Sequence, residues 1–181
     1  YEAVRGVVVR FLNAGAETEI VLNSGTKEGI NAVAYGWAME NLTAGDEIIL
    51  SVMEHHANIV PWHFLRERYG VVLKWVDIDA QGNLDPQAVI DAISERSKLI
   101  AITHMSNVLG SVVDVKTICH HARSRGVPVL VDGSQAAVHH AVDVQDIGCD
   151  FYAITGHKLC GPSGSGAIFM RAERMAEMRP F

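Results

Sequence analysis

Short runs of Val, Ile and Leu alternate along the chain with longer amphipathic segments. The runs predict strands at residues 19–22, 46–51, 71–76, 98–104, 127–134, 151–154 and 166–170. The segments between them predict helices at residues 2–13, 26–40, 58–69 and 115–125, and one that begins near residue 85. This alternation is typical of crossover units, so we expect an α/β fold with a mostly parallel sheet.

Two helix boundaries carry specific signals. Asp85 is a favoured N-cap residue, and Pro86 fits the first helical position, where its missing N–H needs no partner. Gly126 follows the helix at 115–125 and allows the left-handed conformation that ends many helices. No low-complexity linker or internal repeat interrupts the pattern.

Composition narrows the class of partner. The chain has 181 residues, of which 49% are hydrophobic, enough to fill a sizeable core. The net charge is −6 and the 15 Lys and Arg residues are scattered, so no basic surface for nucleic acid is expected. No apolar run approaches the roughly 18 residues that span a bilayer. We therefore expect a small-molecule partner, with no nucleic acid and no membrane.

Cysteine and histidine usage adds little chemistry. The three cysteines are an odd number without C-x-x-C spacing, which favours a reducing, cytoplasmic setting over a disulfide framework. His120 and His121 fall on a predicted helix, where adjacent side chains point about 100° apart. Such a pair is poorly placed to share a metal ion, so we expect no metal site.

Four polar loops follow predicted strands, at residues 24–29, 52–58, 104–110 and 132–140. Ligands of open α/β sheets bind outside the carboxyl ends of the strands, so we expect these loops to converge on one ligand. The segment 24–31, SGTKEGIN, lies between a strand and a helix, and Gly25 permits a tight turn. Its backbone N–H groups suit a phosphate, although any strand-to-helix turn can contain these residues.

Asp132 ends the apolar run 127–131, where an unpaired carboxylate is unfavourable unless a cation faces it. The pyridinium nitrogen of pyridoxal phosphate is such a cation, and an aspartate that keeps it protonated makes the ring an electron sink. This cofactor also needs a lysine for a covalent bond, and Lys158 follows the next predicted strand. The alternative is that Asp132 is a helix N-cap or a turn residue.

His55 and His56 follow another predicted strand. An imidazole can lie flat over a pyridine ring or move protons on a bound substrate. The alternative is a polar loop pair without a role, because histidine doublets also occur at 120–121 and 139–140.

Five sequence blocks together resemble one family. They are GTKEGIN, MEHHANIVPW, THMSNVLG, VDGSQAAVHH and DFYAITGHKLCGP, in this order over essentially the whole chain. They resemble the class V aminotransferases of fold type I, and within them the cysteine desulfurases and selenocysteine lyases of Suf-type iron–sulfur cluster assembly. The resemblance implies a three-layer αβα large domain of a pyridoxal-phosphate-dependent transferase, with a mostly parallel sheet.

The resemblance also implies roles for the residues around the cofactor ring. Lys158 would bind pyridoxal 5'-phosphate covalently and act in catalysis, and His55 would stack on the ring and act in catalysis. Asp132 would pair with the pyridinium nitrogen. Gln135 would hydrogen-bond the phenolic oxygen of the ring.

For the cofactor phosphate, the resemblance implies Thr26, Thr155 and His157, and it places Asn107 at the substrate carboxylate. Family members have G-T-T-E-G at residues 25–29, so Lys27 stands where a second threonine hydroxyl is usual. The ammonium group of Lys27 is a candidate phosphate ligand, and the alternative is that it points into solvent.

By the same resemblance, the whole protein would take sulfur from cysteine, leave alanine, and pass an enzyme-bound persulfide sulfur to a sulfur-acceptor protein. Selenocysteine is a second candidate substrate, and members of the family form homodimers. One alternative is another class V reaction, such as epimerisation, kynurenine cleavage or transamination. The other is a non-catalytic scaffold domain that binds the cofactor.

The chain starts without Met and stops just past a short helical segment, so we expect residues 1–181 to be a partial large domain. An N-terminal segment and the C-terminal small domain would be missing, with the sulfur-accepting cysteine and the substrate-binding arginine. The piece alone would then be inactive. Cys160 stands where the family often has an aromatic residue, and we interpret it as a packed small side chain.

Overall fold

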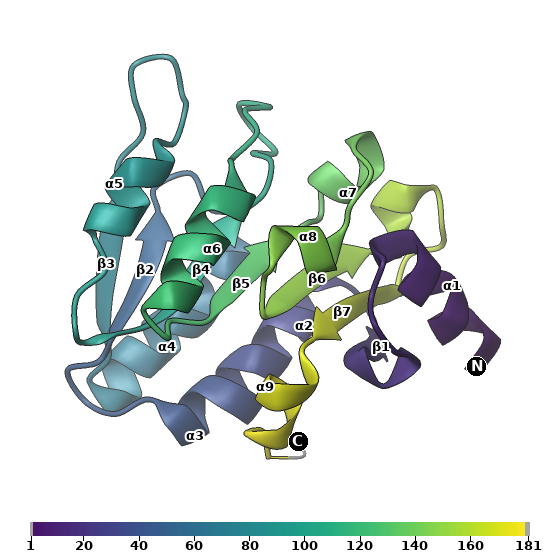
Figure 1. Cartoon of the computed structure of the whole chain (residues 1–181), viewed down its shortest axis with the longest axis horizontal. Coiled ribbons are helices and arrows are strands. Elements are labelled where there is room, and N and C mark those ends of the chain that lie inside the picture. Colours follow the sequence, from purple (N-terminus) through teal and green to yellow (C-terminus); the bar gives the residue numbers. More distant parts are fainter. Residues whose placement is uncertain (1, 180–181) are drawn as a thin grey trace.

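The computed structural model describes residues 2–179, and a seven-stranded sheet forms its centre (Figure 1). In their order across the sheet, the strands are β1 (Ile20–Asn23), β7 (Gly166–Met170), β6 (Phe151–Thr155), β5 (Val129–Asp132), β4 (Ser97–Thr103), β2 (Glu47–Ser51) and β3 (Val72–Val76). The strands from β6 to β3 pair in parallel, whereas β7 is antiparallel to both of its neighbours. The predicted mostly parallel sheet is confirmed.

Helices cover both faces of this sheet and complete the predicted three layers. One face carries α1 (Glu2–Leu12), α5 (Pro86–Asp91), α6 (Val115–Ser124) and α8 (Val144–Ile147). The other carries α2 (Thr26–Ala32), a π-helical segment (Val33–Ala38) and α4 (Val60–Tyr69). The shorter helices are α3 (Met39–Asn41), α7 (Ala136–His139) and α9 (Ala172–Ala176), with 3-10 turns at Glu17–Glu19, His56–Asn58 and Gly156–Leu159. Within residues 2–179, none of these helices is long and apolar enough to cross a membrane.

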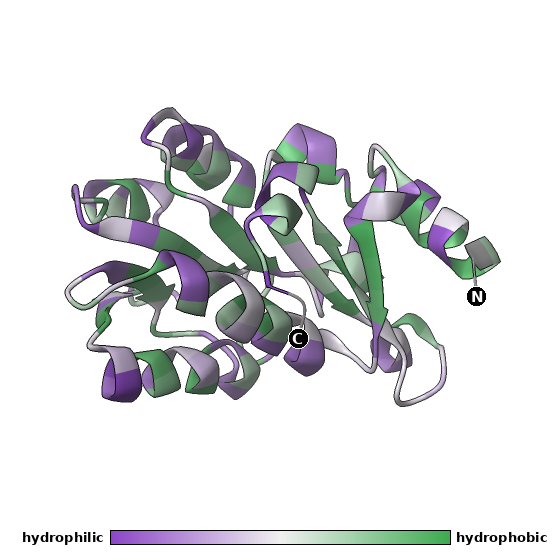
Figure 2. Ribbon diagram, turned by 90° about the horizontal axis from the view of Figure 1, so that it is seen from below, coloured by the Kyte–Doolittle hydropathy of each residue, from purple (hydrophilic) through white to green (hydrophobic). Residues whose placement is uncertain are grey.

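Successive side chains of the central strands enter two separate cores. Ile49 and Ile100 belong to the core on the face that α6 covers, whereas Ile48 and Leu99 belong to the core on the opposite face, and all four are fully buried. Because helices cover both faces, these strands are continuous apolar runs rather than alternating ones. Figure 2 shows mostly green strands between helices that also carry purple, hydrophilic positions.

Local sequence signals set several helix boundaries. Asp85 caps α5 as predicted, because its Oδ1 accepts from the backbone N of Gln87 at 2.9 Å, and Pro86 opens the helix. Gly126 follows α6 with a φ of 71°, as the predicted helix end requires. The helix predicted at 26–40 is a continuous helical run, but its middle part is the π-helical segment, which no local signal predicted.

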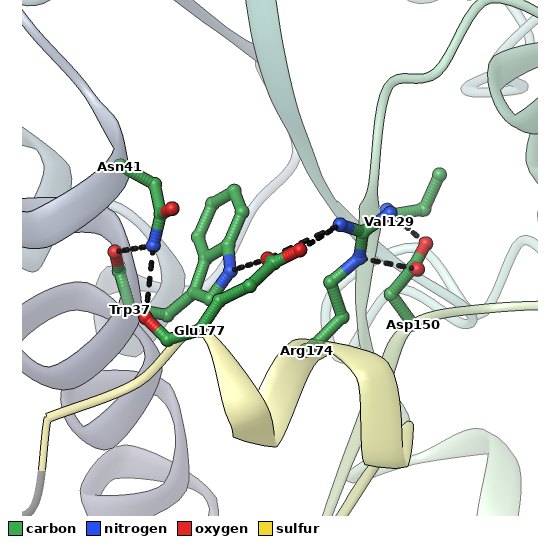
Figure 3. Close-up of polar contacts among 6 residues, drawn as sticks. All are labelled: Trp37, Asn41, Val129, Asp150, Arg174 and Glu177. Carbon is green, nitrogen blue, oxygen red and sulfur yellow. Dashed lines mark hydrogen bonds and ion pairs between the residues drawn. The ribbon is translucent and has the colours of Figure 1, made fainter.

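A polar cluster fastens α9 at the edge of the sheet where β5 and β6 begin (Figure 3). Arg174 Nε donates to Asp150 Oδ1 at 2.9 Å, and Asp150 Oδ2 accepts from the backbone N of Val129 at 2.9 Å. Glu177 accepts from Arg174 Nη1 at 2.9 Å and from Trp37 Nε1 at 2.7 Å. These groups tie α9 to the sheet and to the π-helical segment, and they lie at the opposite strand ends from the predicted ligand loops.

Candidate functional site

A cavity of about 400 Å³ lies at the carboxyl ends of the central strands. It is bordered by residues at or just after the ends of β1, β2, β4, β5 and β6, where a mostly parallel sheet binds ligands. All nine residues assigned to the site from the sequence line this cavity: Thr26, Lys27, His55, Asn107, Asp132, Gln135, Thr155, His157 and Lys158. The predicted convergence of the polar loops is therefore confirmed.

Asp132 is the last residue of β5, and its side chain is 4% exposed. Its Oδ1 accepts from the backbone N of Ser134 at 3.0 Å and lies 2.6 Å from Ser134 Oγ. Across residues 2–179, no salt bridge involves this carboxylate and its side-chain hydrogen bonds use Oδ1. One oxygen thus stabilises the turn after β5, and no hydrogen bond among the described residues uses Oδ2.

Ser134 links this carboxylate to the start of α2. Its Oγ lies 2.7 Å from Thr26 Oγ1, and all three side chains are buried. Because a carboxylate only accepts hydrogen bonds, the Ser134 proton goes to Asp132, and Thr26 then donates to Ser134. The network joins the strand end that carries Asp132 to the predicted phosphate loop.

Glycines bring three segments together beside this loop. Gly25 precedes α2 with a φ of 144°, a conformation that L side chains rarely adopt. A Cβ on Gly25 would lie 3.2 Å from Thr155 Oγ1, and a Cβ on Gly166 would lie 2.5 Å from Gly25 Cα. Thr155 Oγ1 also lies 2.9 Å from His157 Nδ1. The start of α2 and the end of β6 thus form a compact polar corner that suits an anion.

Lys158 lies on the 3-10 turn directly after β6 and is half-buried. β5 and β6 are parallel neighbours in which Asp132 pairs with Ala153, so adjacent strand ends present Asp132 and Lys158 to one cavity. After Lys158, the chain turns back closely, and Gly161 N donates to Gly156 O at 2.8 Å. A Cβ on Gly161 would lie 2.9 Å from that oxygen, so this tight turn after Lys158 requires glycine at residue 161.

His55 is exposed and stands before the 3-10 turn that follows β2. Its Nδ1 accepts from the backbone N of Ala57 at 3.1 Å, so a neutral ring carries its proton on Nε2. His55 and Lys27 also border a second cavity of about 300 Å³, which Tyr35 and Phe64 line. Lys27 is exposed at the border of both cavities, a position compatible with a phosphate contact and with solvent.

The ring of Tyr152 packs against Gly133 in the turn after β5. A Cβ on Gly133 would lie 2.0 Å from Tyr152 Cε1, so only glycine fits between Asp132 and Ser134. Tyr152 Oη lies 2.9 Å from His104 Nδ1. Burial lowers the pKa of His104 to about 4 and raises the pKa of Tyr152 well above its usual value. The backbone that carries Asp132 therefore packs against a hydrogen-bonded pair that is uncharged near neutral pH.

Sequence patterns missed several polar groups of the site. Ser24 and Thr103 line the cavity, and Ser134 holds Asp132. Glu54 is 7% exposed beneath the His55 loop, and its burial raises its pKa to about 7. Ser134 and Glu54 also have partners remote in sequence, Thr26 and Thr103, which local patterns do not reveal. Glu54 nevertheless stands beside the histidine doublet that the sequence did single out.

Cys160 corrects one prediction. Its side chain is exposed rather than packed. The residue ends the 3-10 turn with a φ of 60°, and this left-handed conformation places it in a surface turn instead of the core. Cys119 and Cys149 are the buried cysteines.

The fold and the site together define a class of protein: an αβα fold with a lysine and an aspartate at the ends of adjacent strands. The chain belongs to the aminotransferase class-V family, whose model matches residues 1–181. The resemblance seen in the sequence blocks is thereby confirmed at the level of the family.

Individual relatives are cysteine desulfurases. The chain is 52% identical over 181 residues to a probable cysteine desulfurase of Xylella fastidiosa (strain 9a5c), matching 100% of this chain and 43% of the relative. It is 48% identical over 180 residues to a cysteine desulfurase of Salmonella newport (strain SL254), matching 99% of this chain and 44% of the relative. The chain thus spans less than half the length of the curated relatives it matches.

Solved structures give the same fold. The cysteine desulfurase CsdA from Escherichia coli matches with a TM-score of 0.96 at 42% identity, over 100% of this chain and 45% of that one. The apo cysteine desulfurase from Thermococcus onnurineus NA1 matches with a TM-score of 0.94 at 34% identity, over 99% of this chain and 44% of that one. The predicted fold class is confirmed by both.

Proposed function

We propose that the whole protein is a pyridoxal-phosphate-dependent cysteine desulfurase, which converts L-cysteine to L-alanine and keeps the sulfur as an enzyme-bound persulfide. One observation carries the proposal: nine residues that suit this cofactor and substrate line a single cavity. The chain around them is 52% identical to a probable cysteine desulfurase.

The residues present fit pyridoxal phosphate. Asp132 offers a carboxylate oxygen that no salt bridge uses in the described part of the chain, as a pyridinium nitrogen requires. Lys158 offers an amine on the neighbouring strand end, and Thr26, Thr155 and His157 offer polar groups for a phosphate. When bound, the cofactor supplies an electron sink for negative charge on the substrate Cα.

The chain's own groups then divide the work around that cofactor. Lys158 would hold it covalently and afterwards move the proton at the substrate Cα through Nζ. His55 would lie against the ring face, with its orientation fixed by the N–H of Ala57. Gln135 would donate to the phenolic oxygen of the ring, and Asn107 would face the substrate carboxylate.

The cysteine that accepts the sulfur is proposed to lie outside residues 1–181. Cys119 and Cys149 are buried, and burial raises the pKa of both thiols, which disfavours the nucleophilic thiolate. Cys160 is exposed but is not among the residues that line the cavity. The arginine for the substrate carboxylate is assigned to the same missing part, so this piece alone would be inactive.

The HHANIVPW block at residues 55–62 favours the desulfurase over the other class V reactions. We assign the protein to the Suf type, with selenocysteine as a second substrate. We also assign it to the cytoplasm, as a homodimer that passes sulfur to an acceptor protein. Residues 1–181 are then part of the cofactor-binding large domain.

The test is product analysis of the full-length protein with L-cysteine and a thiol reductant. We expect alanine and sulfide in equal amounts, and alanine with selenide when selenocysteine replaces cysteine. Lys158→Ala is the control and should give neither product. D-cysteine or a keto acid as product would assign another class V reaction, and cofactor binding without turnover would assign the scaffold role.

A further inference from the structure

Glu54 is a buried carboxylate that the proposed reaction does not use. It lies between β2 and His55, and it is 7% exposed. Burial raises its pKa to about 7, and repulsion from Asp132 adds to the rise, so its charge is unfavourable there. A carboxylate in such a place calls for an explanation, because an apolar residue of similar volume is often better for stability.

Three separate segments donate hydrogen bonds to Glu54. Oε1 accepts from Ser51 Oγ at 2.5 Å, at the end of β2, and from the backbone N of Thr103 at 3.0 Å, at the end of β4. Oε2 accepts from Asn58 Nδ2 at 2.8 Å, in the turn before α4. Both ends of the loop that carries His55 are thereby fastened to the sheet.

The direction of these bonds requires acceptors at both oxygens of Glu54. Asn58 Oδ1 accepts from Trp62 Nε1 at 3.1 Å, which fixes the Asn58 amide with its NH2 group toward Glu54. The backbone N–H of Thr103 is a donor in any case. A glutamine at residue 54 has one acceptor oxygen and one NH2 group, so it cannot serve both sides.

We propose that Glu54 is a positioning residue that holds the His55 loop against the ends of β2 and β4 and thereby orients the imidazole at the cavity. His55 is exposed, and its ring is oriented from within its own loop, by the N–H of Ala57. The orientation of the ring therefore depends on the conformation of the loop, which Glu54 fixes from the buried side. This inference rests on the proposed function of the cavity.

The test uses Glu54→Gln in the full-length holoenzyme. The shape is kept, but the new NH2 group faces the NH2 group of Asn58, and the loop is released. We expect the visible circular dichroism of the bound cofactor to change as it does in His55→Ala, with about tenfold slower turnover from one unsatisfied buried pair. In a His55→Ala background, Glu54→Gln should change the dichroism no further.

A second substitution offers a rescue. When Glu54→Gln is combined with Asn58→Asp, the glutamine NH2 group can donate to one oxygen of the new carboxylate, and the other oxygen can still accept from Trp62 Nε1. We expect this double variant to recover most of the wild-type dichroism and turnover. General destabilisation by two buried substitutions would not produce recovery.

Glu47 provides the matched control at the other end of β2. It is also 7% exposed, and it accepts from Ser94 Oγ at 2.6 Å and Ser97 Oγ at 3.1 Å. Glu47→Gln removes a low-exposure acceptor far from the cavity, which also lies 3.8 Å from Lys74 Nζ and from Arg96 Nη2. It should lower stability and leave the cofactor dichroism unchanged.

Wild-type dichroism and turnover in Glu54→Gln would overturn the inference, as would equal changes with and without His55. A wild-type holoenzyme without cofactor or desulfurase activity would instead overturn the proposed function. Amide hydrogen exchange of the full-length wild-type protein tests the loop even if Glu54→Gln fails to fold. We expect slow exchange at Ala57 and Thr103, and rapid exchange at both would show that Glu54 does not hold the loop.

Discussion

Single residues at adjacent strand ends carry the chemistry of the cavity. Lys158 and Lys27 both line it, but only Lys158 lies beside the strand end that carries Asp132. Borohydride reduction of the full-length holoenzyme should therefore fix the cofactor on Lys158. Peptide mapping checks this prediction, with Lys27 as the internal control, and a label on Lys27 would contradict the assignment of the covalent residue.

Ser134 acts at the same scale, through the carboxylate that it holds. Ser134→Ala removes the hydroxyl that lies 2.6 Å from Asp132 Oδ1 but keeps the backbone N–H bond. Since a hydrogen bond to a charged group contributes about 1.5–3 kcal/mol, and one of the two remains, turnover should fall about tenfold. Steady-state kinetics of the full-length enzyme measure this loss.

The effect of Ser134 should depend on Asp132. In an Asp132→Asn background, Ser134→Ala should cause little further loss, because the charge that it stabilises is gone. Ser97→Ala is the control, since Ser97 is a buried serine that donates to the Glu47 carboxylate at the far end of the sheet. Additive losses in the double variant would assign Ser134 a role independent of Asp132.

At the scale of elements, the turn after β5 depends on its packing against β6. Gly133→Ala would place a Cβ 2.0 Å from the Tyr152 ring, so the turn must move. We expect a loss of about 1–3 kcal/mol in the free energy of unfolding and weaker cofactor binding, because Asp132 and Ser134 move with the turn. Urea unfolding and cofactor titration of the full-length protein check the two parts.

Gly126→Ala is the control for Gly133→Ala, because it introduces backbone strain at a glycine away from the cavity. Gly126 has a φ of 71° with nothing near its missing Cβ, and it lies after α6, away from the cavity. Its substitution should reduce stability by about 1–2 kcal/mol and leave cofactor affinity unchanged. Equal losses of affinity in both variants would mean that the turn after β5 has no special role.

Elements and their order could be predicted from the sequence because their causes are local. Continuous apolar runs predicted strands that are buried on both faces, and Asp85 with Pro86 predicted the start of α5. The loops of the cavity followed from the rule for strand carboxyl ends. The π-helical segment was missed because no local signal marks its widened turns, although most of its residues are buried in the core.

The supporting groups of the site were missed for a different reason. Ser134 meets Thr26 across 108 positions of sequence, and Glu54 meets Thr103 across 49. Such pairs exist only once the sheet has formed, so a single sequence gives them no pattern. The prediction that Cys160 is packed was wrong for a local reason, since nothing in the sequence revealed the left-handed turn that exposes it.

At the scale of the whole molecule, the buried Glu54 and the half-buried His104 have opposite effects on the dependence of stability on pH. Burial raises the pKa of Glu54 to about 7 from 4.5, so between these values the folded state holds a proton that the unfolded state has lost. Stability therefore falls as pH rises through this window. Burial lowers the pKa of His104 to about 4 from 6.5, so the unfolded state holds the extra proton there, and stability rises with pH.

Between pH 4.5 and 6.5, the contributions of Glu54 and His104 to the pH dependence of the free energy of unfolding cancel each other in the wild-type protein. Glu54→Gln should leave the His104 slope uncompensated, so that the free energy of unfolding, relative to wild type, rises by about 3 kcal/mol from pH 4.5 to 6.5. His104→Asn should produce a fall of similar size over the same range. Urea unfolding of the full-length apoprotein at several pH values measures both differences. Parallel curves for wild type and both variants would show that neither group is shifted by burial as described.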